Sequence, residues 1–300
     1  MIIDPAHERH ARLLGSVGKP SLKKIMEANE APITAVPTMF PTWNGLCRDE
    51  GGSVGLARGW HIVIAGKTGS GKSLLGLNLA TKVMRTGNKV GFVSLEMSRR
   101  QLITRALAIY TGVPVNDLEP GHNYNAKQFE LATQKFPEHL LYVNKAPIST
   151  LSHIEDAILT AYETEGVEYF VTDYLQLAWV STADNLNNQI TEVSHKIRGL
   201  AQTLGVVSVG LSQYNRETSK SKDRPEATGL MGGSSLENDA DQVVLLDHTT
   251  YKTQSQTSAT QEVILAKNRH GSAGRIAVQW DFNTLRVMEL SKAYDSEANR

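Results

Sequence analysis

Residues 61–73 read HIVIAGKTGSGKS, and the fold of the chain follows from this stretch. Its first part, Ile62 to Ala65, is apolar and predicts a short buried strand. Its second part, GKTGSGKS over residues 66–73, fits the pattern G-x-x-x-x-G-K-[ST] with no mismatch. A mostly apolar run from Leu74 to Met84 then predicts a helix, which Gly87 ends. A strand, a glycine-rich loop and a helix in this order predict a binding site for a nucleoside triphosphate.

The residue types in this loop suit phosphate binding. Glycine lets the backbone turn its N–H groups toward an anion, and the helix that follows adds its own unpaired N–H groups. Lys72 would place a positive charge on the β- and γ-phosphates, and the hydroxyl of Ser73 would bind Mg²⁺. The predicted nucleotide-binding residues are Gly66, Lys67, Thr68, Gly69, Ser70, Gly71, Lys72, Ser73 and Leu74.

The composition of the 300-residue chain is that of a globular protein, with 40% hydrophobic and 21% charged residues. Lysine plus arginine equals aspartate plus glutamate, at 31 each, so any contact with nucleic acid must be confined to a few loops or a channel. The one cysteine, Cys47, excludes a disulfide within the chain and favours a reducing compartment. Because no run approaches the ~20 apolar residues of a membrane span, and the N-terminus has no apolar signal region, we expect a soluble intracellular protein.

Strand patterns alternate with helical patterns along the middle of the chain. Strands are predicted over residues 89–96, 140–143, 167–174 and 206–211. Three later strands, with no helices between them, are predicted over residues 242–246, 262–266 and 275–280. We expect an α/β fold with a mainly parallel central sheet, flanked by helices, and antiparallel strands at its C-terminal end.

The two ends of the chain and one polar segment are expected to lie outside this sheet. Residues 1–40 indicate an extension or linker, whose short helix at 21–28 would be either a solvated tail or a docking arm on a neighbouring subunit. Residues 41–290 form the main predicted domain, and residues 291–300 form a tail. Residues 249–260, rich in threonine, serine and glutamine, are expected to be a flexible surface loop.

Three polar residues close predicted strands at one edge of the sheet, where open parallel sheets bind their ligands. Asp173 is the natural acidic partner of Mg²⁺, through a water molecule. Glu96 could polarise the attacking water as a general base, and Gln213 could donate a hydrogen bond to the γ-phosphate. Each of the last two, taken singly, could be an ordinary surface residue at a strand end. Their joint position after a phosphate loop favours the chemical role.

Six segments carry a resemblance to a known family. They are GWHIVIAGKTGSGKS (59–73), VGFVSLEMSRRQL (90–102), VTDYLQL (171–177), VGLSQYNR (209–216), GGSSLENDADQVVLL (232–246) and AKNRHGSAG (266–274). In this order they resemble the motor domain of DnaB-type replicative helicases, within the RecA-like P-loop ATPases. The SLEM and DYLQL segments are much more specific than a phosphate loop.

The resemblance implies a role for each matched residue. Lys72 and Ser73 match the phosphate-loop lysine and its hydroxyl partner, and Ser73 and Asp173 are the implied metal-linked residues. Glu96 matches the catalytic glutamate, and Gln213 matches the glutamine that couples nucleotide state to DNA. The implied cofactors are ATP, or another nucleoside triphosphate, and Mg²⁺.

The resemblance also implies an assembly. Lys267 and Arg269 match a basic pair that reaches into the neighbouring subunit's site; from the residues themselves, the pair suits an arginine finger in trans or a solvated hairpin tip. The family implies a ring-shaped hexamer with shared ATP sites that moves along single-stranded DNA, usually 5′ to 3′, and separates duplex strands. We expect a separate primase and helicase loader as partners. The expected location is the cytoplasm of a bacterial cell, with a phage or mobile element as a fitting source.

The loops at 181–189, 214–228 and 229–235 could line the channel of such a ring. Backbone N–H groups and positive charges would hold DNA phosphates without reading sequence. Many family members have arginine and glutamate where this chain has Met231 and Gly232, which puts direct phosphate pairing there in doubt. The predicted DNA-binding residues are Arg216, Lys220, Lys222, Arg224, Gly232, Gly233 and Ser234.

Two other functions fit parts of the same pattern. A RecA-like, DNA-dependent ATPase that does not unwind DNA, such as a recombination mediator or a KaiC-like regulator, would use the same nucleotide site. A non-hydrolysing scaffold or loader partner would use nucleotide only to assemble. The presence of Glu96, Asp173 and Arg269 together argues against the scaffold.

Overall fold

The structure of the chain is a computed structural model, and it describes residues 35–47, 54–119, 124–137, 139–143, 150–180, 183 and 185–290. The predicted helix at 21–28 and the predicted tail at 291–300 lie outside the described residues. No helix in the part that is described has the length and apolar character needed to cross a membrane.

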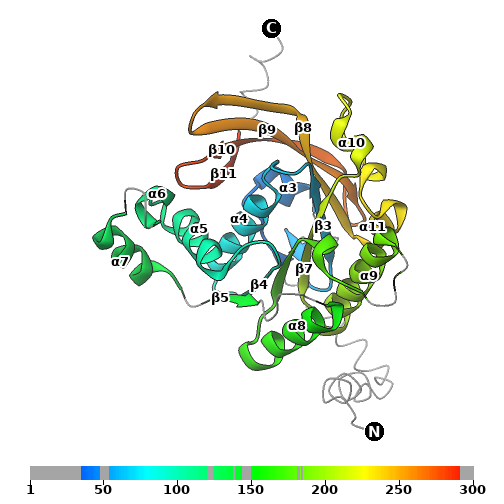
Figure 1. The fold of residues 1–300 in the computed structure, drawn as a ribbon, viewed down its shortest axis with the longest axis horizontal. Coiled ribbons are helices and arrows are strands. Elements are labelled where there is room, and N and C mark those ends of the chain that lie inside the picture. The colour runs from blue at the N-terminus through cyan, green and yellow to red at the C-terminus, as the bar shows by residue number, and fades with distance from the viewer. Residues whose placement is uncertain are drawn as a thin grey trace. The chain divides into compact units, whose positions relative to one another are not determined.

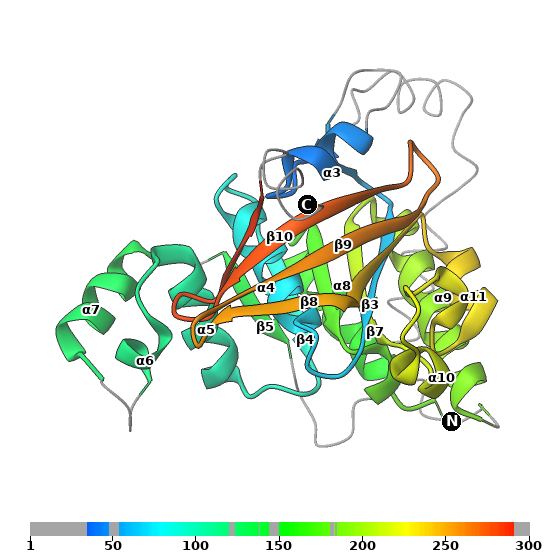
Figure 2. The same ribbon diagram turned by 90° about the horizontal axis from the view of Figure 1, so that it is seen from above.

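A nine-stranded sheet forms the centre of the fold, in the order β11-β10-β9-β8-β3-β7-β6-β4-β5 (Figures 1 and 2). Strands β8, β3, β7, β6, β4 and β5 run parallel to one another. The pairs β8–β9, β9–β10 and β10–β11 are antiparallel, which confirms the predicted sheet. The strand bounds are β3 His61–Gly66, β4 Val90–Ser94, β5 Leu140–Val143, β6 Tyr169–Asp173, β7 Val207–Gln213, β8 Gln242–Ser255, β9 Ser258–Asn268, β10 Gly274–Asp281 and β11 Arg286–Glu289.

Helices cover both faces of the sheet. Crossover connections between the parallel strands place α4 and α5 on one face and α8, α9 and α11 on the other (Figure 1). These five helices are α4 Lys72–Met84, α5 Arg99–Thr111, α8 Leu151–Glu165, α9 Leu186–Leu204 and α11 Gly233–Asp239. The smaller elements are β1 Ala35–Val36, α3 Pro41–Leu46, β2 Leu56–Ala57, α6 Val115–Leu118, α7 Ala126–Lys135, η1 Leu175–Leu177, α10 Arg216–Lys220 and η2 Ala227–Gly229.

Helix boundaries follow signals in the sequence. Ser98 accepts a hydrogen bond from the N–H of Gln101, whose side chain in turn accepts one from the N–H of Ser98, so α5 begins with a complete capping box. Gly166 ends α8 and Gly205 ends α9 in the left-handed backbone conformation, which glycine adopts without steric cost.

The prediction of a flexible loop at residues 249–260 is wrong. These residues extend the β8–β9 hairpin, with Lys252 opposite Thr260 and Ser255 opposite Ser258. Threonine is β-branched and favours extended backbone, and a hairpin can satisfy its polar backbone groups by cross-strand pairing, without a core. The polar composition therefore reflects two exposed faces rather than an absence of structure.

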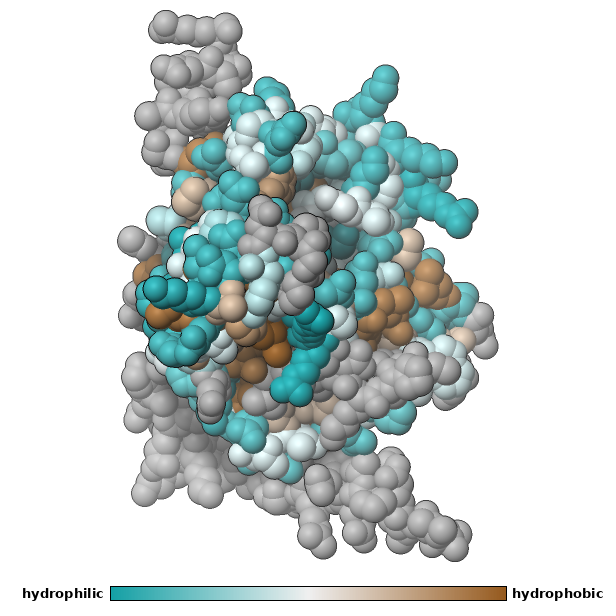
Figure 3. Space-filling model, turned by 60° about the vertical axis from the view of Figure 1, so that its left-hand side comes forward, coloured by the Kyte–Doolittle hydropathy of each residue, from teal (hydrophilic) through white to brown (hydrophobic). Residues whose placement is uncertain are grey.

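Large apolar side chains gather inside the molecule, and those on the surface are scattered. Figure 3 turns the side that carries α5, α6 and α7 toward the viewer and shows hydrophobic groups separated by hydrophilic ones. Between these three helices a small second cluster of buried residues packs apart from the main core: Leu107, Ala108, Leu118 and Ala132. The exposed large apolar residues in the described part are Val54, Tyr124, Leu131, Leu177, Trp179, Leu186, Tyr251 and Met288.

His61, the first residue of β3, is fully buried, and its ring lies against β7 and α9. Its Nδ1 lies 3.3 Å from the Ser208 hydroxyl on β7, and its Nε2 lies 3.4 Å from the Ser194 hydroxyl on α9. Burial lowers the pKa of His61 from its usual 6.5 to about 4, although the carboxylates of Asp241 and Asp239 act in the opposite direction. The imidazole is therefore neutral in the folded protein at neutral pH.

This burial predicts an acid-sensitive fold. Below pH 6.5 the unfolded chain binds a proton at His61, whereas the folded chain does so only near pH 4. The free energy of unfolding should therefore fall as the pH drops through this window, by at most about 3 kcal/mol from this group. Urea unfolding at pH 7.5, 6 and 5 measures the slope, which His61→Gln should reduce. The exposed His153→Gln serves as the control, and an equal slope in the His61 variant would disprove the assignment.

Candidate functional site

Strand register brings the predicted catalytic residues to one edge of the sheet. Gly66 at the end of β3 pairs with Gln213 at the end of β7, and Ser94 at the end of β4 pairs with Asp173 at the end of β6. The N–H of Leu95 donates to the carbonyl of Asp173 at 2.8 Å, which holds the following Glu96 beside that strand. The carboxyl ends of four neighbouring strands thus surround one space, as expected for an open parallel sheet.

The phosphate loop has the geometry of an anion cradle. Gly69 has φ 78° and Gly71 has φ 96°, both in the left-handed region that favours glycine. A Cβ on Gly66 would lie 2.4 Å from the Ser70 hydroxyl oxygen, so a side chain there would close the loop. The 13-residue helix α4 begins after Gly71 and directs its first N–H groups into the loop.

Lys72 lies in this cradle, where no carboxylate of the described residues forms an ion pair with it. Its ammonium donates to the carbonyls of Gly66 and Lys67, each at 3.0 Å, and only 7% of the residue is exposed. Burial lowers the pKa of Lys72, while the charges of Asp173 and Glu96 act to raise it. Two neutral carbonyls compensate a buried ammonium poorly, so the site favours an incoming anion.

Trp280 on β10 packs against the phosphate loop, a contact that the sequence does not predict. A Cβ on Gly71 would come within 2.9 Å of the indole ring, so the backbone of the loop rests directly on this side chain. Trp280 is 1% exposed, and its ring N–H donates to the Gln261 side chain at 3.1 Å. No short motif links residues 71 and 280, because only the antiparallel half of the sheet brings them together.

Asp173 is the most perturbed carboxylate of the site. It is 1% exposed, and neither of its oxygens has a hydrogen-bond partner of normal geometry in the part of the chain that is described. Burial raises its pKa from 3.8 to about 6; the nearby Ser73 hydroxyl, Lys72 and Arg105 favour the charged form. Two buried, unsatisfied carboxylate oxygens beside a hydroxyl are hard donors that suit Mg²⁺.

The metal would need ligands from outside the protein. The described residues contain no group of three or more histidine, cysteine, aspartate or glutamate side chains that could hold an ion by themselves. Mg²⁺ commonly takes one or two protein ligands and completes its shell with water and phosphate oxygens. Ser73 and Asp173 therefore fit a metal that arrives with a nucleotide.

Two further residues belong to this edge, although the sequence did not single them out. Burial raises the pKa of the Tyr174 hydroxyl, helped by the charges of Glu96 and Asp173, while the nearby Gln213 side chain acts to lower it. Arg105 on α5 contributes positive charge at Asp173 and donates to the Met97 sulfur at 3.4 Å. Tyr174 lies within the segment VTDYLQL and Arg105 lies shortly after the segment VGFVSLEMSRRQL, but strand and helix patterns do not say which way a side chain points.

The basic pair lies at the opposite edge of the sheet. The N–H of Arg269 donates to the carbonyl of Asp241 at 2.9 Å, and the N–H of Asp241 donates to the carbonyl of His61 at 2.8 Å. Arg269 is therefore level with the start of β3, about 17 Å along the strand from Gly66. The Arg269 guanidinium and the Lys267 ammonium contact the carbonyls of Asn238 and Glu237 on α11. They cannot reach the phosphate loop of their own chain.

The four cations among the predicted DNA-binding residues divide into two groups. Arg224 lies 3.1 Å from the buried carboxylate of Asp247 and 3.1 Å from Glu262, so its charge is already neutralised within the chain. The other three cations, Arg216, Lys220 and Lys222, are exposed.

The glycine-rich segment 232–234 packs on α9, where a Cβ on Gly232 would lie 2.9 Å from Ile190. The N–H of Met231 donates to the carbonyl of Gln213 at 3.0 Å. This contact joins the segment directly to the nucleotide edge of the sheet.

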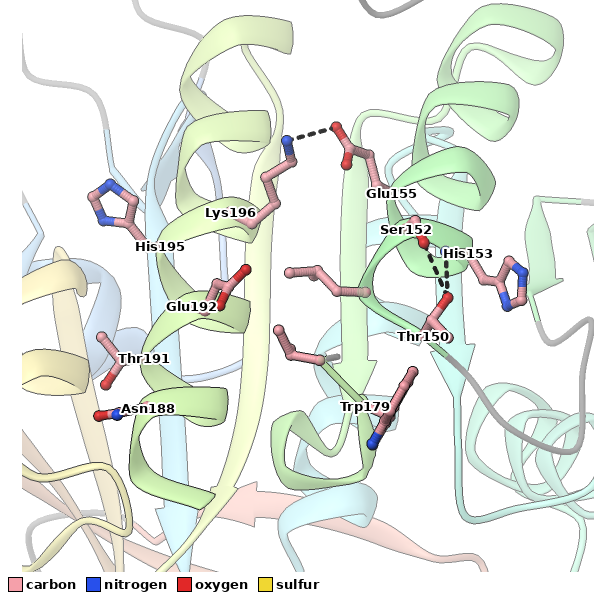
Figure 4. A pocket seen from close by; sticks show the side chains of 12 residues that line it. Thr150, Ser152, His153, Glu155, Trp179, Asn188, Thr191, Glu192, His195 and Lys196 are labelled. Carbon is pink, nitrogen blue, oxygen red and sulfur yellow. Dashed lines mark hydrogen bonds and ion pairs between the residues drawn. The ribbon is translucent and has the colours of Figure 1, made fainter. Parts of the chain in front are cut away.

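A cavity of about 910 Å³ lies elsewhere, between α8 and α9. Figure 4 shows Trp179 at one end and the ion pair between Lys196 and Glu155, 3.0 Å apart, at the other. Its lining includes none of the predicted nucleotide residues. A phosphate loop binds its ligand in a shallow cradle of backbone N–H groups, so a large cavity is not its signature.

Comparison with known proteins fits this geometry. Residues 49–289 match the family described as DnaB-like helicase C terminal domain. The chain belongs to this family. The resemblance carried by the six sequence segments is thereby confirmed.

Two relatives are identical to the chain at about a third of the aligned positions or fewer. A probable plasmid replicative DNA helicase of Chlamydia psittaci is 32% identical over 226 residues, or 73% of this chain and 49% of that protein. The replicative DNA helicase DnaB of Geobacillus stearothermophilus is 26% identical over 279 residues, or 91% of this chain and 60% of that protein. The chain thus spans about half the length of the curated relatives it matches.

Solved structures show the same fold. A DnaB-like replicative helicase, described together with its interactions with primase, has a TM-score of 0.76 at 23% identity over 96% of this chain and 72% of that one. A second solved structure, described as an ATPase domain, has a TM-score of 0.73 at 23% identity, over 96% of this chain and 100% of that one. The predicted α/β fold is confirmed, and the chain shares it with these two structures.

The buried carboxylate predicts that function and stability conflict at Asp173. Because burial raises its folded pKa to about 6, the charge costs stability progressively as the pH rises from 3.8 through 6. Asp173→Asn should raise the free energy of unfolding of the nucleotide-free, metal-free chain by ~1–3 kcal/mol at pH 8, and its melting temperature by a few degrees. At pH 4 the substitution should hardly change the melting temperature. Calorimetry tests this, with the exposed Glu163→Gln as the control. An unchanged or lower melting temperature at pH 8 would contradict it.

Proposed function

We propose that the chain is an ATP-driven replicative DNA helicase that encircles single-stranded DNA as a ring hexamer and separates duplex strands, 5′ to 3′. One observation carries this proposal. The phosphate loop, Glu96, Asp173 and Gln213 meet at one edge of the sheet, whereas Lys267 and Arg269 lie at the other. A complete site therefore needs two chains, and a ring supplies every site with a neighbour.

At the phosphate edge, each residue has a distinct task. The Lys72 ammonium exchanges two carbonyl contacts for the β- and γ-phosphates, and the backbone N–H groups of residues 69–73 hold their oxygens. Mg²⁺, held by Ser73 and through water by Asp173, would neutralise charge on the same phosphates. Glu96 is exposed at the mouth of the site and orients the attacking water as general base.

At the opposite edge, Arg269 and Lys267 act on the neighbour. In the single chain both groups bond to carbonyls at the end of α11, where a cation is favoured by the helix dipole. In the ring they would extend toward the neighbouring nucleotide and stabilise the charge that develops on the transferred phosphoryl group. Such a finger is typically worth ~10³–10⁵ in rate.

Single-stranded DNA would contact the loops between β7 and α11. Arg216, Lys220 and Lys222 are exposed where they can meet phosphates, and the backbone N–H groups of 232–234 follow them in the chain. Arg224 instead fixes the loop to β8 and β9 through Asp247 and Glu262. The hydrogen bond from Met231 to Gln213 gives a short path from the γ-phosphate sensor to this DNA segment.

The wider setting is proposed on the same basis. The relatives' names describe replicative helicases, one of them plasmid-encoded, and one structural neighbour is described with primase. We propose a separate primase and loader as partners, cytoplasmic action in a bacterial cell, and a motor domain over residues 41–290 between an N-terminal extension and a short tail.

The test combines three measurements on the full chain: ATP hydrolysis with and without oligo(dT), mass by light scattering, and strand separation on a fork with a free 5′ tail. Hydrolysis should rise with DNA, the mass should approach six chains, and the strands should separate. Stimulated hydrolysis without separation would replace the helicase with a RecA-like regulator or mediator.

Glu96→Gln sharpens this test. It should bind a fluorescent ATP analogue like the wild type and still assemble, but hydrolyse ATP ~10²–10⁴-fold more slowly because the general base is lost. Glu163→Gln, exposed on α8, is the matched control and should hydrolyse normally. Unchanged turnover in the Glu96 variant would place the base elsewhere.

A further inference from the structure

The turn that carries Arg269 is stacked on Trp60, the residue before the strand that leads to the phosphate loop. We name residues 267–271 the finger turn. His270, directly after Arg269, lies flat on Trp60, with ring centroids 4.2 Å apart and an angle of 10° between the ring planes. A stacked aromatic pair fixes both the position and the plane of its two rings.

Trp60 is a fixed base for this contact. Its carbonyl accepts a hydrogen bond from the N–H of Ser208 at 2.9 Å, and its own N–H donates to the carbonyl of Ala57 at 3.2 Å. It directly precedes β3, whose six residues are all buried. The position of the indole is therefore set by the sheet and not by the finger turn.

Asp241 links the same turn to the sheet from the other side. One of its carboxylate oxygens accepts the N–H of His61 at 2.8 Å, which anchors the group on β3. Its other oxygen lies 3.8 Å from the Arg269 guanidinium and 3.8 Å from the His270 ring. Arg269 thus leaves the sheet between an anchored carboxylate and a residue that is locked by stacking.

The stack is not needed to form the turn itself. The Asn268 side chain donates to the carbonyls of Leu46 and Ser272, at 2.9 and 3.2 Å. Gly271 packs so closely on the Leu46 carbonyl that a Cβ would lie 1.9 Å from its oxygen. The His270 side chain is 40% exposed and contributes little to a core. What the stack adds is a defined direction for the residue next to it.

We propose that His270, stacked on Trp60, is a positioning residue that aims Arg269 at the nucleotide site of the neighbouring chain. The inference rests on the proposed function, in which Arg269 acts in trans. Small displacements of a catalytic group from its working position cost up to ~10²-fold in rate. Loss of the His270 imidazole should therefore impair the neighbour's nucleotide site and leave the chain's own phosphate cradle intact.

Three variants separate stacking from other roles. His270→Ala should lower the kcat of DNA-stimulated ATP hydrolysis ~10–100-fold, with unchanged affinity for a fluorescent ATP analogue and an unchanged mass by light scattering. His270→Phe keeps a stacking ring and should restore most of the kcat. His270→Gln keeps a polar group near Asp241 but no ring, and should behave like alanine. The control is Tyr251→Ala, which removes an exposed ring on the β8–β9 hairpin.

Mixed assemblies test the direction of the effect. A chain with His270→Ala has an intact phosphate loop, and a chain with Lys72→Ala has an intact finger turn. Mixing them should give more hydrolysis than the sum of the two separate proteins, because some sites then combine both intact halves. No gain on mixing, a fall in nucleotide affinity with His270→Ala, or failure of phenylalanine to rescue would overturn the positioning role.

Arg269→Ala, run in parallel, keeps this inference distinct from the proposed function. If Arg269→Ala is inactive and His270→Ala is normal, the finger stands and the positioning role of His270 is refuted. If Arg269→Ala hydrolyses ATP like the wild type, the finger itself is refuted and the positioning role with it.

Discussion

The arrangement of the site depends on one constraint, the length of the strands, which sets the distance between the two edges of the sheet. The parallel strands end together, so Gly66, Asp173 and Gln213 meet at one edge. The antiparallel strand β9 runs back across the sheet and delivers Arg269 to the opposite edge, about 17 Å away. A rigid, hydrogen-bonded sheet cannot fold these edges together. In the proposed function, one chain therefore carries two half-sites, and association with a neighbouring chain would complete each site.

Each half-site holds charge that its own chain compensates incompletely. At one edge, within the described part of the chain, Lys72 donates to two neutral carbonyls and the buried oxygens of Asp173 have no partner of normal geometry, so a nucleotide and a metal would stabilise both charges. At the other edge, Arg269 and Lys267 contact carbonyls of α11, and the Arg269 guanidinium also lies 3.8 Å from the Asp241 carboxylate. In the proposed function, binding would replace weak internal contacts by strong ones, and this exchange would couple nucleotide, neighbour and DNA to one another.

Much of this arrangement could be predicted from sequence. The phosphate loop, the strand-end positions of Glu96, Asp173 and Gln213, and the mixed sheet all follow from local patterns, because residue periodicity and strand order determine them. The roles of Trp280, Trp60 and Asp241 could not, since each depends on which distant segments the antiparallel strands bring together. The polar composition of residues 249–260 also led to a wrong prediction, because cross-strand pairing forms a hairpin from a segment whose tip is exposed. Likewise, the sequence gives no sign that Arg224 forms ion pairs with Asp247 and Glu262.

The central claim is that one site is built from two chains, and complementation between two inactive variants tests it most directly. Lys72→Ala lacks a phosphate cradle, and Arg269→Ala lacks a finger, so each protein should hydrolyse almost no ATP in the presence of single-stranded DNA. In a mixture, some interfaces join the intact cradle of one chain to the intact finger of the other. Hydrolysis well above the sum of the separate proteins is the predicted result. A mixture as inactive as its components, despite confirmed co-assembly, would contradict the claim.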